Sequence, residues 1–197
     1  MEPDGIPAVV VARYLREQGI VVEKTGYYSF LVLFTIGITR GKSGTLIAEL
    51  VRFRERYRSN TPLRDVFPDL VRDYSRRYSA VGLADLCSAI HRSFRKGGLP
   101  ILGHEVVLDL PDMAMTPSEA FNWLVKGEVE EVPVDSLAGR VPAVLIVPYP
   151  PGIPLIMPGE RFGGPGSPLI RYLTAVCEFR DQFPGFEHEV QGLIVRE

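Results

Sequence analysis

The sequence predicts an α+β fold, because helical periodicity and strand-like apolar runs both occur along its 197 residues. Apolar residues spaced three or four positions apart, as on one face of a helix, recur over 6–18, 41–57 and 83–96. Nearly continuous apolar runs, typical of strands covered on both faces, occupy 28–38, 143–147 and 153–157. A chain of this length is sufficient for one large domain or two small ones.

The first part of the chain predicts a helix–strand–strand–helix unit. Its helices are expected over 6–18 and 41–57, and its strands over 20–25 and 28–38. Pro7 suits the first turn of a helix, and Gly19 suits a C-terminal cap. The unit has too little apolar surface to form a core alone, so we expect it to be half of a larger α/β layer.

A polar turn that contains a helix-breaking proline, Ser59-Asn60-Thr61-Pro62, separates residues 1–60 from residues 61–197. Further elements are expected beyond it: helices over 69–78 and 83–96, a strand over 128–134, a glycine-rich loop over 163–166, a helix over 168–183 capped by Ser167, and a strand over 190–195. Gly97-Gly98 should end the helix over 83–96.

The clearest helix start is Thr116-Pro117-Ser118-Glu119. Thr116 is the expected N-cap, Pro117 takes the first helical position, and Glu119 completes a capping box. The helix should end at Gly127.

A proline-rich hairpin is expected where the runs 143–147 and 153–157 meet at Tyr149-Pro150-Pro151-Gly152. Prolines fix φ and remove backbone donors, so this segment cannot be the middle of a regular ladder. A stiff apolar hairpin is either a rigid core turn or a wall beside a ligand channel, and composition does not decide between them.

Composition excludes several classes of partner. The formal net charge is −2, so nothing indicates nucleic acid or an anionic membrane. Cys87 and Cys177 are expected as buried free thiols. The acidic start and the absence of an apolar run long enough to span a bilayer favour a cytoplasmic protein.

Few residues suggest chemistry by themselves. Gly41-Lys42-Ser43 lacks the glycine that a phosphate-binding loop needs five residues earlier, where Ile36 stands. The three histidines have no second ligand at helical spacing, so no metal site is expected. Glu23-Lys24-Thr25, between two predicted strands, is either a solvated turn or a place where a carboxylate meets a cationic substrate group.

Longer motifs resemble the bacterial ornithine/lysine/arginine decarboxylase family. The most specific are Pro148-Tyr149-Pro150-Pro151-Gly152-Ile153-Pro154 and Pro184-Gly185-Phe186-Glu187. Further matching stretches lie at 5–11, 19–26, 34–42, 60–63, 115–117 and 157–160. The resemblance implies that residues 1–60 are the second half of an aminotransferase-like small domain, and that 61–197 are the family's α+β C-terminal domain.

This family uses pyridoxal 5′-phosphate to remove the α-carboxyl group of a basic amino acid. Its Schiff-base lysine lies in a Ser-x-His-Lys motif, and none of the lysines at 24, 42, 96 and 126 follows a histidine. We therefore expect the C-terminal portion of such an enzyme, inactive alone, without catalytic or cofactor-binding residues of its own. The implied partners are the rest of the enzyme and further copies, as dimers or pentamers of dimers.

By resemblance, Glu23 meets the distal cationic group of the substrate, with Lys24 and Thr25 beside it. Tyr149 and Glu160 are expected to border the substrate entrance. The substrate stays open: 39–42 and 60–63 look more like the arginine branch, whereas Glu23-Lys24-Thr25-Gly26 also occurs in lysine enzymes. The alternative is a free-standing, non-catalytic regulatory or binding module derived from the family.

Overall fold

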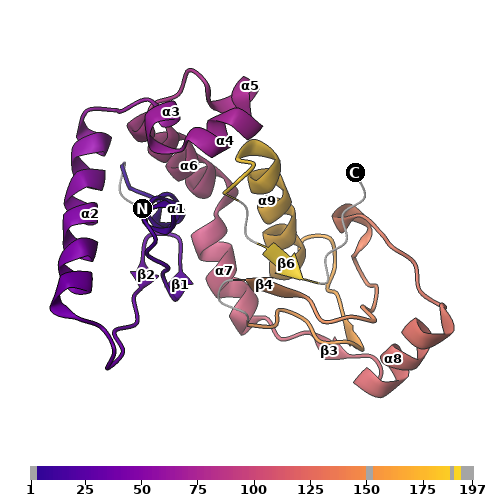
Figure 1. The fold of residues 1–197 in the computed structure, drawn as a ribbon. Coiled ribbons are helices and arrows are strands. Elements are labelled where there is room, and N and C mark those ends of the chain that lie inside the picture. The colour runs from indigo at the N-terminus through magenta and orange to yellow at the C-terminus, as the bar shows by residue number, and fades with distance from the viewer. Residues whose placement is uncertain (1–3, 150–152, 187–188, 192–197) are drawn as a thin grey trace. The chain divides into compact units, whose positions relative to one another are not determined.

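Helices and short strands alternate irregularly in the computed structural model, which describes residues 4–149, 153–186 and 189–191 (Figure 1). The chain forms two compact units. The first contains the residues up to Lys96 together with Phe183–Phe186, and the second contains Gly97–Gln182 and the residues after Phe186. The α+β class predicted from the sequence is confirmed. The division between residues 60 and 61 concerns the family's domains and stays a prediction.

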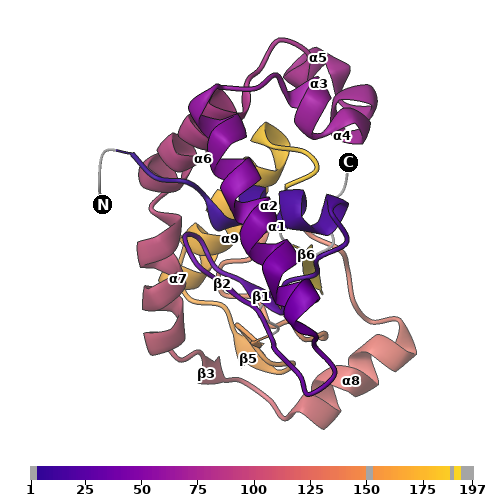
Figure 2. The same ribbon diagram turned by 60° about the vertical axis from the view of Figure 1, so that its left-hand side comes forward.

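The first unit is mainly helical. Its helices are α1 (Ala8–Glu17), α2 (Arg40–Arg58), α3 (Leu63–Val66), α4 (Pro68–Asp73), α5 (Ser75–Tyr78) and α6 (Leu83–Gly97). Its strands are β1 (Lys24–Thr25) and β2 (Phe30–Leu31), which pair antiparallel. Helix α1 packs against α2 and contacts β1, and the strands form a narrow hairpin below it (Figure 2). The core residues that α1 and α6 supply include Val10, Leu15, Leu86, Ile90 and Phe94.

Two predictions for this unit are wrong. The apolar run 28–38 is not a long buried strand, because only Phe30 and Leu31 pair and Leu33, Phe34 and Ile36 beyond them are exposed. A strand needs a neighbour, and this unit offers the run only a two-residue partner. The helix expected over 69–78 is interrupted at Tyr74, whose φ of −126° and ψ of 48° are not helical. This break lets Tyr78 enter the core, where its hydroxyl donates to the Pro184 carbonyl at 2.9 Å.

The second unit combines helices with two small ladders. Its helices are α7 (Leu99–Leu108), α8 (Pro117–Lys126), the 3₁₀ turn η1 (Val134–Ser136) and α9 (Pro168–Gln182). Strand β3 (Asp112–Met113) pairs antiparallel with β5 (Glu160–Arg161), and β4 (Val147–Tyr149) pairs with β6 (Glu189–Gln191). Helix α7, which was not predicted from the sequence, packs against α9. Gly98, with φ +64°, separates α7 from α6.

Of the helix caps and strands predicted for this unit, some are confirmed and others are wrong. The capping box of Thr116 and Glu119 forms, and α8 ends at Gly127 with φ +72°. The side-chain cap expected from Ser167 does not form, because its hydroxyl has no hydrogen-bond partner in the described part of the chain. The strand expected over 128–134 is wrong: residues 128–131 are exposed, and η1 follows. Of the strand expected over 190–195, residues 192–195 lie outside the described residues.

The proline-rich hairpin is partly confirmed. Its two arms meet at a single antiparallel bridge between Ile146 and Ile156, and both of these side chains are buried. The expectation that both faces are covered is wrong for Val144, Leu145, Ile153 and Met157, which are exposed. Pro150, Pro151 and Gly152 at the hairpin tip lie outside the described residues. The strand β4 that leads into the tip belongs to a ladder of only two strands, as its proline requires.

Candidate functional site

Glu23, Lys24 and Thr25 lie together on the β1–β2 hairpin of the first unit. The Glu23 backbone N–H donates to the Leu31 carbonyl at 2.8 Å, and Lys24 stands opposite Leu31 in the ladder. Glu23 is exposed, and its carboxylate makes no ion pair or hydrogen bond with any described residue. The hairpin therefore presents a carboxylate that is free to accept a cationic group.

The hairpin is anchored to α6 through its turn residues. The Tyr28 hydroxyl lies 2.7 Å from Nδ1 of His91, which is buried, and burial raises the pKa of the Tyr28 phenol. The rings of Tyr27 and Phe94 meet edge to face at 5.1 Å. A Cβ added at Gly5 would stand 2.7 Å from the same His91 nitrogen, so Gly5 leaves room for this pair. The sequence showed His91 only as a helix residue without a metal partner, and its role here is to position the hairpin.

Glu160 and Tyr149 lie in the second unit. The Glu160 carboxylate accepts a hydrogen bond from the Met157 backbone N–H at 2.7 Å and so closes the turn that precedes β5. Gly159 in that turn has φ +89°, and a Cβ there would stand 2.4 Å from the Met115 carbonyl. Tyr149 pairs with Glu189 through the backbone, and its side chain lies outside the described residues. The place of both residues at a substrate entrance stays a prediction.

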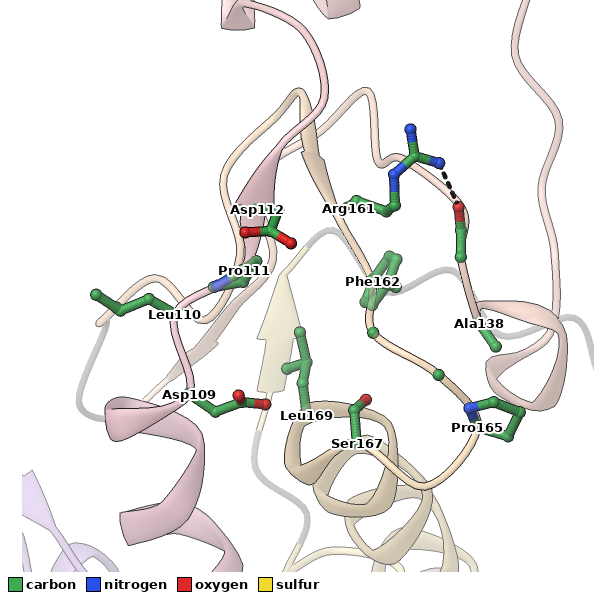
Figure 3. Close-up of a pocket in the computed structure, with 13 residues that line it drawn as sticks. Asp109, Leu110, Pro111, Asp112, Ala138, Arg161, Phe162, Pro165, Ser167 and Leu169 are labelled. Carbon is green, nitrogen blue, oxygen red and sulfur yellow. Dashed lines mark hydrogen bonds between the residues drawn. The ribbon is translucent and has the colours of Figure 1, made fainter.

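An open pocket of about 540 Å³ lies between α7, β3, β5 and the start of α9 (Figure 3). We call it the aspartate pocket, and its lining residues include Asp109, Asp112, Arg161, Phe162, Ser167 and Leu169. Asp112 and Arg161 are partners in the β3–β5 ladder, but the guanidinium of Arg161 donates to the Gly139 carbonyl at 3.0 Å. The pocket therefore keeps unpaired carboxylate oxygens beside an apolar floor.

A second open pocket, of about 650 Å³, lies in the same unit. Its walls are mostly apolar and include Trp123, Val144 and Ile146, and its acidic residues come from the segment 128–131. Glu130 there pairs with Arg140. The apolar pattern of this segment predicts a strand and gives no sign of a pocket.

The residues present do not fit a Schiff-base site for pyridoxal phosphate. All four lysines, Lys24, Lys42, Lys96 and Lys126, are exposed, and neither of the two pockets has a lysine in its lining. A lysine that forms a Schiff base is normally held in a desolvated site, which lowers its pKa. Across the described ranges, no group of three or more metal-ligating side chains is arranged to hold an ion.

Both units contain residues that match models of known protein domains. The model of the Orn/Lys/Arg decarboxylase C-terminal domain matches residues 101–197, and that of the Orn/Lys/Arg decarboxylase major domain matches residues 1–42. The chain belongs to the Orn/Lys/Arg decarboxylase family. Lysine decarboxylase LdcA of Pseudomonas aeruginosa is 50% identical over 193 residues, which are 98% of this chain and 26% of that protein. Biodegradative arginine decarboxylase of Escherichia coli strain K12 is 39% identical over 98% of this chain and 25% of that protein.

Solved structures of the family have the same fold. Lysine decarboxylase A from Pseudomonas aeruginosa superposes with a TM-score of 0.93 at 49% identity, over 100% of this chain and 26% of that one. Constitutive lysine decarboxylase of E. coli gives 0.89 at 41% identity, over 97% of this chain and 27% of that one. The chain thus spans about a quarter of the length of the family members it matches. None of the described helices has the length and hydropathy needed to cross a bilayer.

Proposed function

We propose that this chain is the C-terminal part of a pyridoxal 5′-phosphate-dependent decarboxylase that acts on a basic amino acid. The observation that carries the proposal is the similarity along almost the whole chain to decarboxylases about four times as long. The matched models follow the order of major domain and then C-terminal domain. In this proposal the cofactor, its lysine and the reacting atoms belong to the rest of the enzyme. In this proposal the enzyme is cytoplasmic, as its sequence leads us to expect, and homo-oligomeric, as the resemblance implies.

The exposed apolar side chains after β2 support the proposal. Leu33, Phe34 and Ile36 are 58%, 57% and 109% exposed, on a run that the sequence marks as buried. A contiguous exposed apolar segment of this kind is typical of an interaction surface. We infer that the remainder of the aminotransferase-like layer covers this segment in the whole enzyme and completes the sheet that the hairpin begins.

Within this proposal, Glu23 binds the distal ammonium or guanidinium group of the substrate. A carboxylate without a partner among the described residues can form a charge-assisted hydrogen bond with such a group. Lys24 and Thr25 position it through the hairpin ladder. Tyr149 and Glu160 border the entrance, where Glu160 stabilises the turn before β5.

Lysine is the substrate that we propose. The lysine decarboxylases of P. aeruginosa and E. coli are 50% and 41% identical to this chain, whereas the arginine and inducible ornithine enzymes of E. coli are 39% and 35% identical. The E. coli lysine and arginine enzymes differ by only two percentage points in identity to this chain, at 41% and 39%, so arginine and ornithine are tested in the same assay.

A chimera tests the proposal. The upstream region of P. aeruginosa LdcA is joined to this chain in place of its own C-terminal quarter, and CO₂ release from lysine, arginine and ornithine is measured. Intact LdcA and LdcA truncated at the junction are the controls. We expect the chimera to decarboxylate lysine and this chain alone to release no CO₂. A chimera that is folded and loaded with cofactor but inactive towards all three amino acids would favour the non-catalytic module instead.

A further inference from the structure

The turn of the β1–β2 hairpin is attached to two helices of the first unit by three contacts. The Ala8 backbone N–H donates to the Tyr27 carbonyl at 2.9 Å, which ties the turn to the start of α1. On α6, Phe94 packs edge to face on the Tyr27 ring, and Nδ1 of His91 lies 2.7 Å from the Tyr28 hydroxyl. Phe94 and His91 are only 1% and 2% exposed, so both support the turn from within the packed core.

The hairpin has few bonds of its own. Its ladder consists of two residue pairs, and a two-stranded ladder of this length is not stable alone in water. Glu23 stands directly before β1, and its backbone N–H donates to the Leu31 carbonyl of the opposite strand. The place of the Glu23 carboxylate therefore depends on where the ladder lies. The contacts of the turn with α1 and α6 determine that position.

Gly5 leaves the space in which Tyr28 and His91 meet. A Cβ at position 5 would stand 2.7 Å from Nδ1 of His91 and 3.1 Å from Cε1 of Tyr28. Carbon atoms do not approach a nitrogen as closely as 2.7 Å without a bond, so one of the two side chains would have to move. Tyr28 is 40% exposed and has room to move, whereas His91 is enclosed. A side chain at position 5 therefore displaces the turn without any change in the hairpin or in α6.

We propose that Tyr28, His91 and Gly5 set the substrate selectivity of the enzyme, because they fix the place at which the Glu23 carboxylate meets the distal ammonium group. This inference rests on the proposed function, in which Glu23 binds that group. A carboxylate held in one place favours an ammonium group at one distance from the reacting carbon. On a loosened hairpin it meets ammonium groups at several distances, and it discriminates less between lysine and the shorter ornithine. The three residues act through Glu23 and are therefore positioning residues.

Amide hydrogen exchange of the 197-residue chain, followed by NMR, tests the anchoring without cofactor or catalysis. Tyr28→Phe removes only the hydroxyl and should speed exchange of the Glu23 and Gly26 amides by about 3- to 10-fold, the loss of one neutral hydrogen bond. Gly5→Ala should speed it by a similar factor. Tyr74→Phe is the matched control, since this ring is 39% exposed and its hydroxyl makes no hydrogen bond with the described residues. Unchanged exchange in Tyr28→Phe or in Gly5→Ala would overturn the anchoring.

Selectivity is measured in the chimera described above, as the ratio of kcat/KM for lysine to kcat/KM for ornithine. Tyr28→Phe and Gly5→Ala should each lower this ratio by about 3- to 10-fold, and Tyr74→Phe should leave it unchanged. In a Glu23→Gln background the same two changes should add almost nothing, because their effect passes through that carboxylate. His91→Asn keeps a polar atom near the place of Nδ1 and should retain more of the ratio than His91→Leu.

The outcomes separate this inference from the proposed function. An inactive chimera, or an unchanged ratio in Glu23→Gln, contradicts the proposed function, and the inference falls with it. If Glu23→Gln lowers the ratio but Tyr28→Phe and Gly5→Ala do not, the inference alone is overturned. Equal effects of Tyr28→Phe with and without the Glu23 carboxylate would also overturn it, since they would assign Tyr28 a general structural role. Circular dichroism of each variant confirms that it is folded.

Discussion

The side chain of Asn60 occupies the space that Gly82 leaves empty. A Cβ added at Gly82 would stand 2.1 Å from Oδ1 of Asn60. The same oxygen accepts hydrogen bonds from the backbone N–H groups of Ala84 and Asp85, at 2.9 and 3.3 Å, and so caps the first turn of α6. Asn60 has φ +47°, a left-handed conformation that asparagine tolerates better than most residues. One residue thus ends the α2 segment and starts α6.

We predict that Gly82→Ala destabilises the first unit, because the new methyl group displaces the Asn60 amide. The cost should be about 1–3 kcal/mol of unfolding free energy. Urea denaturation measures it.

In an Asn60→Gly background the same change should cost much less, since the obstructing side chain is gone. Gly44→Ala on α2, where a Cβ meets no atom within 4 Å, is the control and should add about 0.5–1 kcal/mol of stability. Equal costs of Gly82→Ala in both backgrounds would contradict this.

The second prediction concerns Arg13, whose guanidinium lies between two rings of the first unit. Its carbon is 5.7 Å from the centroid of Phe67 and 5.3 Å from that of Phe186, and Nη1 donates to the Gly185 carbonyl. Arg13→Met keeps most of the hydrocarbon stem but removes the charge and the donor. We expect a loss of about 1–3 kcal/mol, measured by urea unfolding. Arg16→Met, at an exposed position on the same helix, should change stability by less than about 0.5 kcal/mol. Similar losses in both variants would show that the cation–π contacts contribute little.

Alkaline stability should depend on Tyr14. Its hydroxyl donates to Glu49 Oε2 at 2.9 Å, and burial together with this carboxylate raises the pKa of Tyr14 to about 12, from 10.0. The folded state therefore holds the proton more tightly than the unfolded state. The contribution is fully present below pH 10 and is lost as pH rises towards about 12.

We predict that the unfolding free energy falls between about pH 10 and 12, and that the fall is shallower in Tyr14→Phe. Tyr28, Tyr57 and Cys87, whose pKa values burial also raises, keep part of the fall in that variant. Urea unfolding at each pH gives the slope. Tyr74→Phe, at an exposed ring whose hydroxyl makes no hydrogen bond with the described residues, should retain the wild-type slope. An unchanged slope in Tyr14→Phe would rule out the role of Tyr14.

Helices could be predicted from the sequence because their signals are local. Thr116 and Glu119 lie three residues apart and form their capping box without help from the rest of the chain. The failure at Tyr74 has a different cause, since the break depends on contacts of Tyr78 with Pro184 and Phe186, far along the sequence. The strands over 28–38 and 128–134 were overpredicted because pairing requires a neighbour that an apolar pattern does not reveal.

The two candidate sites differ in the same respect, since one is a continuous motif and the other is built from segments far apart in the chain. The motif Glu23-Lys24-Thr25 is continuous, so resemblance could identify it, and the structure adds that its carboxylate is unpaired among the described residues. The aspartate pocket draws Asp112 and Ser167 from segments far apart in the chain, and neither residue belongs to a motif. Only the β3–β5 register, which no local pattern reveals, places Asp112 opposite Arg161.

The last prediction concerns Glu23 in the chimeric enzyme. If its carboxylate holds the distal ammonium of lysine, Glu23→Gln removes a charge-assisted contact of about 1.5–3 kcal/mol and lowers kcat/KM for lysine by roughly 10- to 100-fold. Norleucine has the same chain without the ammonium group, so its kcat/KM should hardly change and the preference for lysine should collapse. Glu55→Gln, at an exposed position on α2, is the control. An equal loss for both amino acids would indicate that Glu23 supports the hairpin rather than the substrate, and unchanged kinetics would remove Glu23 from the site.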